Sequence, residues 1–177
     1  MIRSRRKTIS IEIRRNGDVV VRAPLKESLR SIDDFVDSRS GWIEKTRTLV
    51  KKQYDPSLKK FTDYEIEEMK KAAKSFFDVA VKKYSAVMGV KPSKITVRVQ
   101  KTRWGSCSAK KTVSFNALLV CFPPEIAESV VVHELCHLRY MNHSSEFYKE
   151  VLKYCPDYKK CKEFLKKHGG EVLSRIT

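Results

Sequence analysis

The run Val132–His143 holds the residues of this 177-residue chain that are best suited to chemistry. It contains the pattern HExxH, formed by His133, Glu134 and His137, and a third histidine, His143, six residues further on. Positions i and i+4 lie about 40° apart around a helix, so the first two histidines share a face and can bind one Zn²⁺. Glu134 lies on the neighbouring flank, where its carboxylate can reach a metal-bound water instead of the metal.

The third histidine needs a change in chain direction. A helix that simply continued would carry His143 away from the other two imidazoles. Asn142 and Ser144 both favour leaving or restarting a helix, so we expect a bend there that brings His143 back. Three neutral nitrogens leave a fourth position open to water, which is typical of a catalytic zinc site. The sequence therefore predicts one Zn²⁺ per chain, held by the three histidines.

These residues predict a zinc-dependent hydrolase, with a metallopeptidase as the main interpretation. Glu134 would take a proton from the zinc-bound water and pass it to the leaving amine. The developing oxyanion needs a stabiliser besides the zinc. The sequence offers three candidates for this role and does not choose among them: Arg103, Tyr140 and Tyr158. The segment around Trp104 and Gly105 is either a strand that contacts an extended peptide substrate or a bend beside a core tryptophan.

The charge keeps two further interpretations open. The chain has 37 Lys+Arg and 21 Asp+Glu, a net charge of +16, which favours contact with nucleic acid or a nucleotide. One alternative is thus a metal-dependent nucleotide or phosphoanhydride hydrolase, although we find no Walker-type loop and no carboxylate cluster for Mg²⁺. A nucleic-acid-associated protease is the second alternative. A basic binding module with a structural zinc is the non-enzymatic interpretation.

Composition predicts a folded protein with no membrane partner. Hydrophobic residues make up 41% of the chain, and no apolar run approaches the roughly 20 residues that a bilayer requires. The basic start has no apolar stretch of a signal peptide, so we expect a cytoplasmic protein. The five cysteines lack a CxxC spacing and are expected to be reduced, with Cys136 buried. The oligomeric state stays open.

The first third of the chain predicts a hairpin followed by helix. Residues 7–23 alternate apolar and polar side chains around an Asn16-Gly17 turn, which indicates two antiparallel strands. Residues 28–52 indicate one helix or two, with a break at Gly41. The segment around Pro56 is a connector. We therefore expect an N-terminal extension at 1–58 and a hydrolase domain at 59–177, packed as one compact unit.

The sequence after residue 58 predicts a long helix, then the strands of a small sheet, and then further helices. Helical periodicity is strong in residues 62–88, where either Thr62 or Asp63 can cap the start and Gly89 is suited to the end. The other expected elements, in chain order, are a strand at 95–99, a hairpin at 104–116, a helix from Pro123-Pro124 to about Tyr140, a short helix capped by Ser144, and a last helix from Pro156 to Gly169-Gly170.

Several short motifs together resemble a known family. They are Arg103–Ser108 (RWGSCS), Ser114–Asn116 (SFN), the HELCHLRYMNHS run with Phe147, and Pro156–Tyr158 (PDY). This set resembles the YgjP-like metallopeptidase family, which is related to the SprT-like and WLM zinc proteases. Metzincins share the histidine spacing, but Tyr140 stands where they have glycine.

The resemblance implies the fold, the metal site and a class of substrate. It implies an α+β, minigluzincin-type zincin domain with a short, mostly antiparallel sheet, a backing helix and an HExxH helix. His133, His137 and His143 match the family's metal ligands, and Glu134 matches its general base. Protein or peptide is the implied substrate. SprT-like relatives act on proteins attached to DNA, in agreement with the basic charge.

Overall fold

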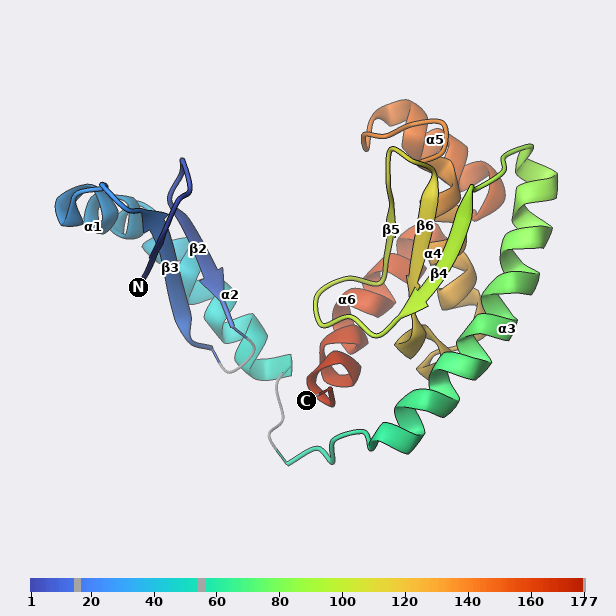
Figure 1. Cartoon of the computed structure of the whole chain (residues 1–177), viewed down its shortest axis with the longest axis horizontal. Coiled ribbons are helices and arrows are strands. Elements are labelled where there is room, and N and C mark those ends of the chain that lie inside the picture. Colours follow the sequence, from blue (N-terminus) through green and yellow to red (C-terminus); the bar gives the residue numbers. More distant parts are fainter. Residues whose placement is uncertain (15–16, 54–56, 177) are drawn as a thin grey trace. The chain divides into compact units, whose positions relative to one another are not determined.

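The chain forms two compact units, Met1–Leu58 and Lys59–Thr177 (Figure 1). The computed structural model describes residues 1–14, 17–53 and 57–176. Each unit has its own three-stranded sheet and its own helices, so the fold belongs to the expected α+β class. None of the helices within the described residues combines the length and the apolar character that crossing a bilayer requires.

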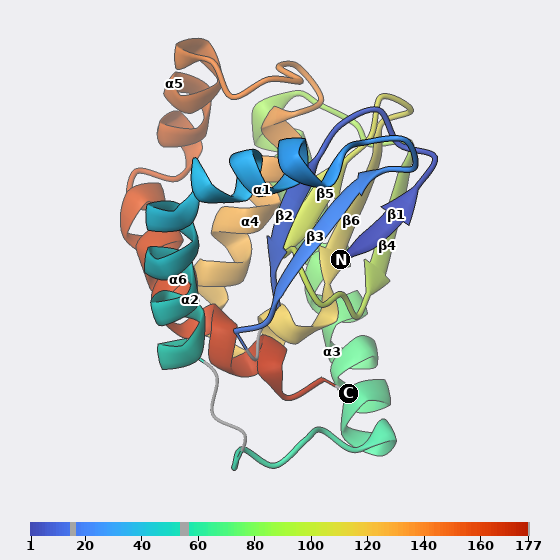
Figure 2. The same ribbon diagram turned by 90° about the vertical axis from the view of Figure 1, so that its left-hand side faces the viewer.

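The first unit has two helices on one side of its sheet (Figure 2). Its strands, in spatial order, are β1 (Ile2–Ser4), β3 (Val19–Pro24) and β2 (Ser10–Ile13). β2 and β3 are antiparallel, with Ile13 opposite Val19, which confirms the hairpin. Its predicted turn residue Asn16 lies outside the described residues. β1 pairs parallel to β3 and was not expected from the sequence.

The helical part of this unit is divided earlier than predicted. α1 is Leu29–Asp37 and α2 is Ser40–Gln53. Gly41 lies inside α2, so the prediction of a break at this glycine is wrong. Ser38 is the C-cap of α1 instead: its N–H makes a last helical bond to the carbonyl of Asp34 at 3.0 Å, and its hydroxyl donates to the otherwise unpaired end of the helix at the carbonyl of Phe35, at 2.7 Å.

The second unit begins with the long helix α3 (Asp63–Met88), as predicted. A capping box starts it: Thr62 Oγ1 accepts from the N–H of Glu65, and the Glu65 carboxylate accepts from the N–H of Thr62. Gly89 ends it in the left-handed conformation, with φ of 63°. The side chains that α3 buries recur at helical spacing: Ala73, Phe77, Ala80, Val81 and Met88.

The sheet of the second unit is mixed. Its spatial order is β4 (Lys94–Arg98), β6 (Thr112–Asn116) and β5 (Gly105–Cys107). β5 and β6 form the predicted antiparallel hairpin, whereas β6, which lies between the other two strands, runs parallel to β4. Each of the two sheets thus has one parallel and one antiparallel pair, so the expected antiparallel character holds for only half of the pairings.

One helix lies at the centre of the second unit. After the 3-10 turn η1 (Ala117–Cys121), α4 (Pro124–Cys136) packs against β5, β6 and three other helices, behind the sheet in Figure 1. Its neighbours include α5 (Ser145–Tyr154) and α6 (Tyr158–Ser174). Side chains on nearly all sides of α4 are buried: Ile126, Ala127, Ser129, Val130, Val131, Val132, Glu134, Leu135 and Cys136. A helix that is apolar all round belongs in a core, and this helix carries the HExxH pattern.

Two helix ends differ from the prediction. α4 ends at Cys136 instead of near Tyr140, and His137 is its C-cap residue. α6 does not end at Gly169-Gly170 but continues to Ser174. Gly169 is a packing residue, since a Cβ there would lie 2.7 Å from the Trp104 ring. The glycine therefore lets the indole lie against α6.

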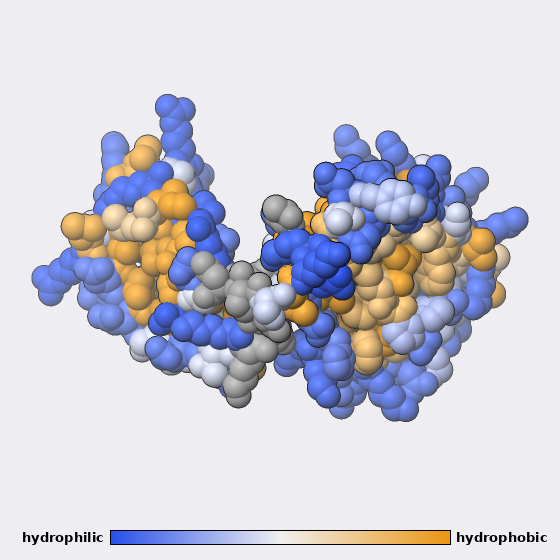
Figure 3. All heavy atoms as spheres, turned by 90° about the horizontal axis from the view of Figure 1, so that it is seen from below, coloured by the Kyte–Doolittle hydropathy of each residue, from blue (hydrophilic) through white to orange (hydrophobic). Residues whose placement is uncertain are grey.

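The surface of both units is mostly hydrophilic on the face seen in Figure 3, with hydrophobic areas between the polar side chains. In the first unit, large apolar side chains reach solvent: Leu25, Leu29, Trp42 and Leu49. All five cysteines are free thiols, and Cys136 is fully buried, as expected.

Candidate metal centre

The three predicted histidines converge. One ligand nitrogen from each of His133, His137 and His143 lies within 4.8 Å of the other two. The ring centroids are 4.7–5.1 Å apart, and Nε2 of His133 is 3.2 Å from Nε2 of His143. The first two residues come from the end of α4, and His143 comes from the loop between α4 and α5. The spacing of these nitrogens is what a single metal ion needs.

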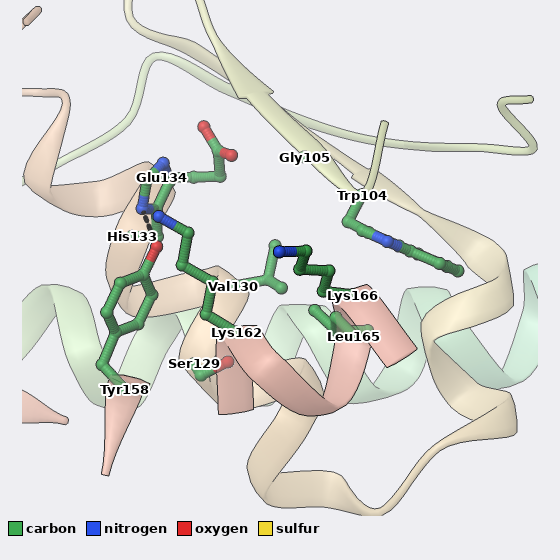
Figure 4. A pocket seen from close by; sticks show the side chains of 10 residues that line it. All are labelled: Trp104, Gly105, Ser129, Val130, His133, Glu134, Tyr158, Lys162, Leu165 and Lys166. Carbon is green, nitrogen blue, oxygen red and sulfur yellow. Dashed lines mark hydrogen bonds between the residues drawn. The ribbon is translucent and has the colours of Figure 1, made fainter. Parts of the chain in front are cut away.

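The outward nitrogens of two imidazoles have partners that orient the rings. Nδ1 of His137 is 2.9 Å from the backbone oxygen of Tyr140, and a carbonyl oxygen only accepts, so Nδ1 carries the hydrogen. Nδ1 of His133 is 2.7 Å from the hydroxyl of Tyr158 (Figure 4). In both rings Nε2 is left to point at a metal, which is the usual arrangement of metal-binding histidines.

Burial keeps these imidazoles neutral. Burial, with smaller effects from His137 and His143, lowers the pKa of His133 to about 3. Burial also lowers the pKa of His137, against a raising effect of its bond to the Tyr140 backbone. A metal ligand must offer a lone pair, so neutral rings at neutral pH suit the site.

Phe147 packs behind all three rings. Its centroid is 4.9, 4.6 and 4.9 Å from those of His133, His137 and His143, and its side chain is fully buried. Ser144 caps α5 by accepting from the N–H of Phe147 at 3.3 Å, which fixes the start of this helix two residues after His143. The phenyl ring thus limits how far each imidazole can turn.

The loop that carries His143 is tied to two helices. Arg139 forms an ion pair with Glu150 of α5 at 2.5 Å, and its other guanidinium nitrogen donates to the carbonyl oxygen of Met88 at the end of α3. The chain turns directly after α4, at residues 137–139, and bends again at Met141 and Asn142, where a bend was expected. Anchoring at Arg139 helps to bring the chain back under the end of α4.

Glu134 is buried beside the histidines. Only 5% of the residue is exposed, and the side chain extends toward the strand that carries Gly105 (Figure 4). Burial raises the pKa of Glu134 to about 8, opposed by the positive charge of Arg103. Glu134 lines two cavities together with His133, and the smaller one, about 270 Å³, also includes His137 and His143. A carboxyl group of this basicity can exchange a proton near neutral pH.

The other predicted site residues divide into two groups. Trp104, Gly105 and Tyr158 line the larger cavity, of about 310 Å³, with His133 and Glu134. Arg103 and Tyr140 line neither of these two cavities. Arg103 is exposed and acts on Glu134 through its charge, whereas Tyr140 contributes its backbone oxygen to His137.

Asn116 positions the segment before β5. The sequence did not predict this role. It is fully buried, and its Nδ2 donates to the backbone oxygens of Gln100 and Arg103 at 2.8 and 2.9 Å. Its N–H donates to the oxygen of Trp104 at 2.8 Å. The only sequence signal was its place in the SFN motif, because its partners lie more than ten positions away.

Comparisons with known proteins identify the family of this chain. The YgjP-like metallopeptidase domain family matches residues 7–67 and 65–168, well over half of the chain. The crystal structure of the metallopeptidase zymogen of Pyrococcus abyssi, abylysin, has a TM-score of 0.44 and 22% identity, over 54% of this chain and 93% of that one. No curated protein matches the chain. With its three histidines gathered and the family matched along most of its length, the chain belongs to the YgjP-like metallopeptidases, which makes it a metal-dependent hydrolase.

Proposed function

We propose that His133, His137 and His143 hold one zinc ion and that Glu134 is the proton-transfer residue in the hydrolysis of a peptide bond. The convergence of three ligand nitrogens within 4.8 Å, with the Glu134 carboxylate in the same cavities, is the observation that carries this proposal. The donor set suits zinc, which prefers nitrogen ligands and keeps an open position when three protein ligands bind it.

The chemistry is divided between the ion and the chain. Zinc held by the three histidines would supply a Lewis acid and make water more acidic. Glu134 accepts a proton from that water and donates it to the leaving amine. Burial raises the pKa of Glu134, whereas a zinc ion beside it would favour the carboxylate, the form that accepts a proton; the buried site favours the protonated form, which donates it.

The substrate would bind as an extended strand beside β5. β5 is at the edge of its sheet and pairs with β6, and its residues Gly105–Cys107 line the cavity that contains all three histidines. A peptide can add to such an edge through backbone hydrogen bonds. Trp104 lines the neighbouring cavity and would contact a substrate side chain.

Of the three candidates for stabilising the oxyanion, the geometry favours Tyr158. Its hydroxyl reaches His133 and lines the larger cavity, whereas Arg103 and Tyr140 line neither cavity. Burial raises the pKa of Tyr158 above its ordinary value, so the hydroxyl keeps its proton and can donate it in a hydrogen bond.

A substrate panel tests the reaction class. The zinc-loaded chain is incubated with casein, with peptides and with nucleoside triphosphates, and compared with Glu134→Gln. Peptide hydrolysis should fall by about 10²–10⁴-fold in this variant, while its zinc content is kept. Glu163→Gln, at an exposed position of α6, is the matched control. Loss of a phosphate-releasing activity alone would overturn the peptidase proposal and favour phosphoanhydride hydrolysis.

A further inference from the structure

The larger cavity beside the histidines has a chemical character of its own. Its volume is about 310 Å³, room for one amino-acid side chain, and Trp104, Val130 and Leu165 supply apolar walls. It adjoins Glu134, the proposed proton-transfer residue. A substrate residue next to the scissile bond can therefore place its side chain here.

Two lysines of α6 line the same cavity. Lys162 and Lys166 are one helical turn apart, so they project from the same face, and Figure 4 shows both extending from α6 at the cavity. The positive charge of Lys162 contributes to lowering the pKa of His133, so the two side chains are close. Among the described residues that line the cavity, Glu134 contributes the one carboxylate. The cavity thus combines apolar walls with two ammonium groups.

We propose that this cavity is a specificity pocket for a substrate residue that carries a carboxylate. Lys162 and Lys166 bind the carboxylate, and Val130, Leu165 and Trp104 contact the aliphatic part of the same residue. This inference rests on the proposed peptidase function and names its preferred substrates. The carboxylate comes either from an acidic side chain or from the C-terminus of the substrate, and the two sources are separated by experiment.

Pocket shape and charge favour a carboxylate on an aliphatic stem over a polyphosphate. Two lysines balance a single negative charge amply but balance a triphosphate poorly. No glycine-rich loop offers backbone N–H groups to phosphate in the described part of this cavity, whose one glycine, Gly105, lies against Glu134. Both lysines are exposed, so water and salt weaken their effect and we expect a preference of roughly tenfold.

Matched peptides test the pocket in the zinc-loaded 177-residue chain. Peptides that differ only by Glu or Gln at each position around the cleaved bond are compared by kcat/KM. The Glu/Gln ratio should be about tenfold at one position, fall toward unity in Lys162→Met and Lys166→Met, and decrease with added salt. A second pair, with a free or an amidated C-terminus, identifies the source of the carboxylate.

Lys167→Met is the matched control, because it removes the same charge from the same helix outside the cavity. It should keep the Glu/Gln ratio of the wild type. If the Glu/Gln ratio fell as much in this variant as in the two pocket variants, the effect would be one of general charge and the pocket proposal would be overturned. A wild-type ratio near unity at every position, with both types of C-terminus, would overturn it as well.

Binding separates this inference from the peptidase proposal. Zinc-loaded Glu134→Gln is titrated with fluorescent Glu and Gln peptides, so a missing peptidase activity does not hide the pocket. Tighter binding of the acidic peptide, lost in the Glu134→Gln, Lys166→Met double variant, supports the inference even without cleavage. Equal binding of the two peptides, or stronger displacement by a nucleoside triphosphate than by the acidic peptide, would contradict it.

Discussion

Gly105 and Glu134 are in direct contact across the boundary between β5 and α4. A Cβ atom at position 105 would lie 2.5 Å from Oε1 of Glu134 and 2.7 Å from its Cγ, closer than a real Cβ approaches another heavy atom. Glycine is therefore the residue that lets the edge strand reach the buried carboxylate. This contact places β5, the strand beside which we propose that the substrate binds, next to the proposed proton-transfer residue.

Gly105→Ala should displace the Glu134 carboxylate while leaving the histidines in place. Because a displacement of about 1 Å can cost about 10²-fold in rate, we expect a loss of this order in kcat/KM for a peptide. The zinc content should stay at one per chain. Gly41→Ala is the control, since nothing lies within 4 Å of a Cβ there. Full peptidase activity in Gly105→Ala would show that the contact is irrelevant.

Tyr158→Phe should weaken metal binding. The hydroxyl of Tyr158 is 2.7 Å from Nδ1 of His133, and loss of such an outer partner typically costs about 10–100-fold in metal affinity or activity. Competition with a zinc chelator measures the affinity. Tyr154→Phe, on α5, is the control and should bind zinc like the wild type. Unchanged zinc affinity in Tyr158→Phe would mean that the hydroxyl does not orient the imidazole.

Glu134 should make the metal-free chain less stable as the pH rises. Burial raises its pKa from 4.5 to about 8, so between these values the folded state binds more protons than the unfolded state. The contribution of Glu134 to the free energy of unfolding is thus fully present below about pH 4.5 and lost as the pH rises toward 8, a change of a few kcal/mol.

Urea unfolding of metal-free protein at about pH 5 and about pH 8 measures this effect. The free energy of unfolding of the wild type should decrease relative to that of Glu134→Gln, whose amide does not titrate. Added zinc should reduce the difference, since a nearby cation favours the carboxylate. Parallel pH dependence of the two metal-free proteins would contradict the assigned pKa.

Local spacing made part of this site predictable. His133 and His137 are four residues apart, so their common face follows from helix geometry alone. Glu134 and His143 were predicted from the same run of residues, and the family motifs matched them. α3 and its cap at Thr62 were also predictable, because a helix period and a cap residue are both local features of the sequence. Such features depend on residues that are close together in the sequence, so they can be predicted from it.

Tertiary contacts set the features that the sequence did not reveal. Gly169 looked like a helix end, yet it is buried under Trp104, which is 65 positions earlier in the chain. Phe147 was noted with the family motifs, but its contact with all three imidazoles depends on the fold of the loop after α4. Likewise, the common face of Lys162 and Lys166 follows from their spacing, whereas the cavity that this face lines does not.

X-ray absorption at the zinc edge tests the central claim most directly. The chain loaded with one equivalent of zinc should show three imidazole nitrogens at about 2.0–2.1 Å and one further light ligand. His143→Ala should lose one imidazole, and Glu134→Gln should keep the wild-type spectrum. A sulfur ligand at about 2.3 Å, or fewer than three imidazoles in the wild type, would contradict a centre built from His133, His137 and His143.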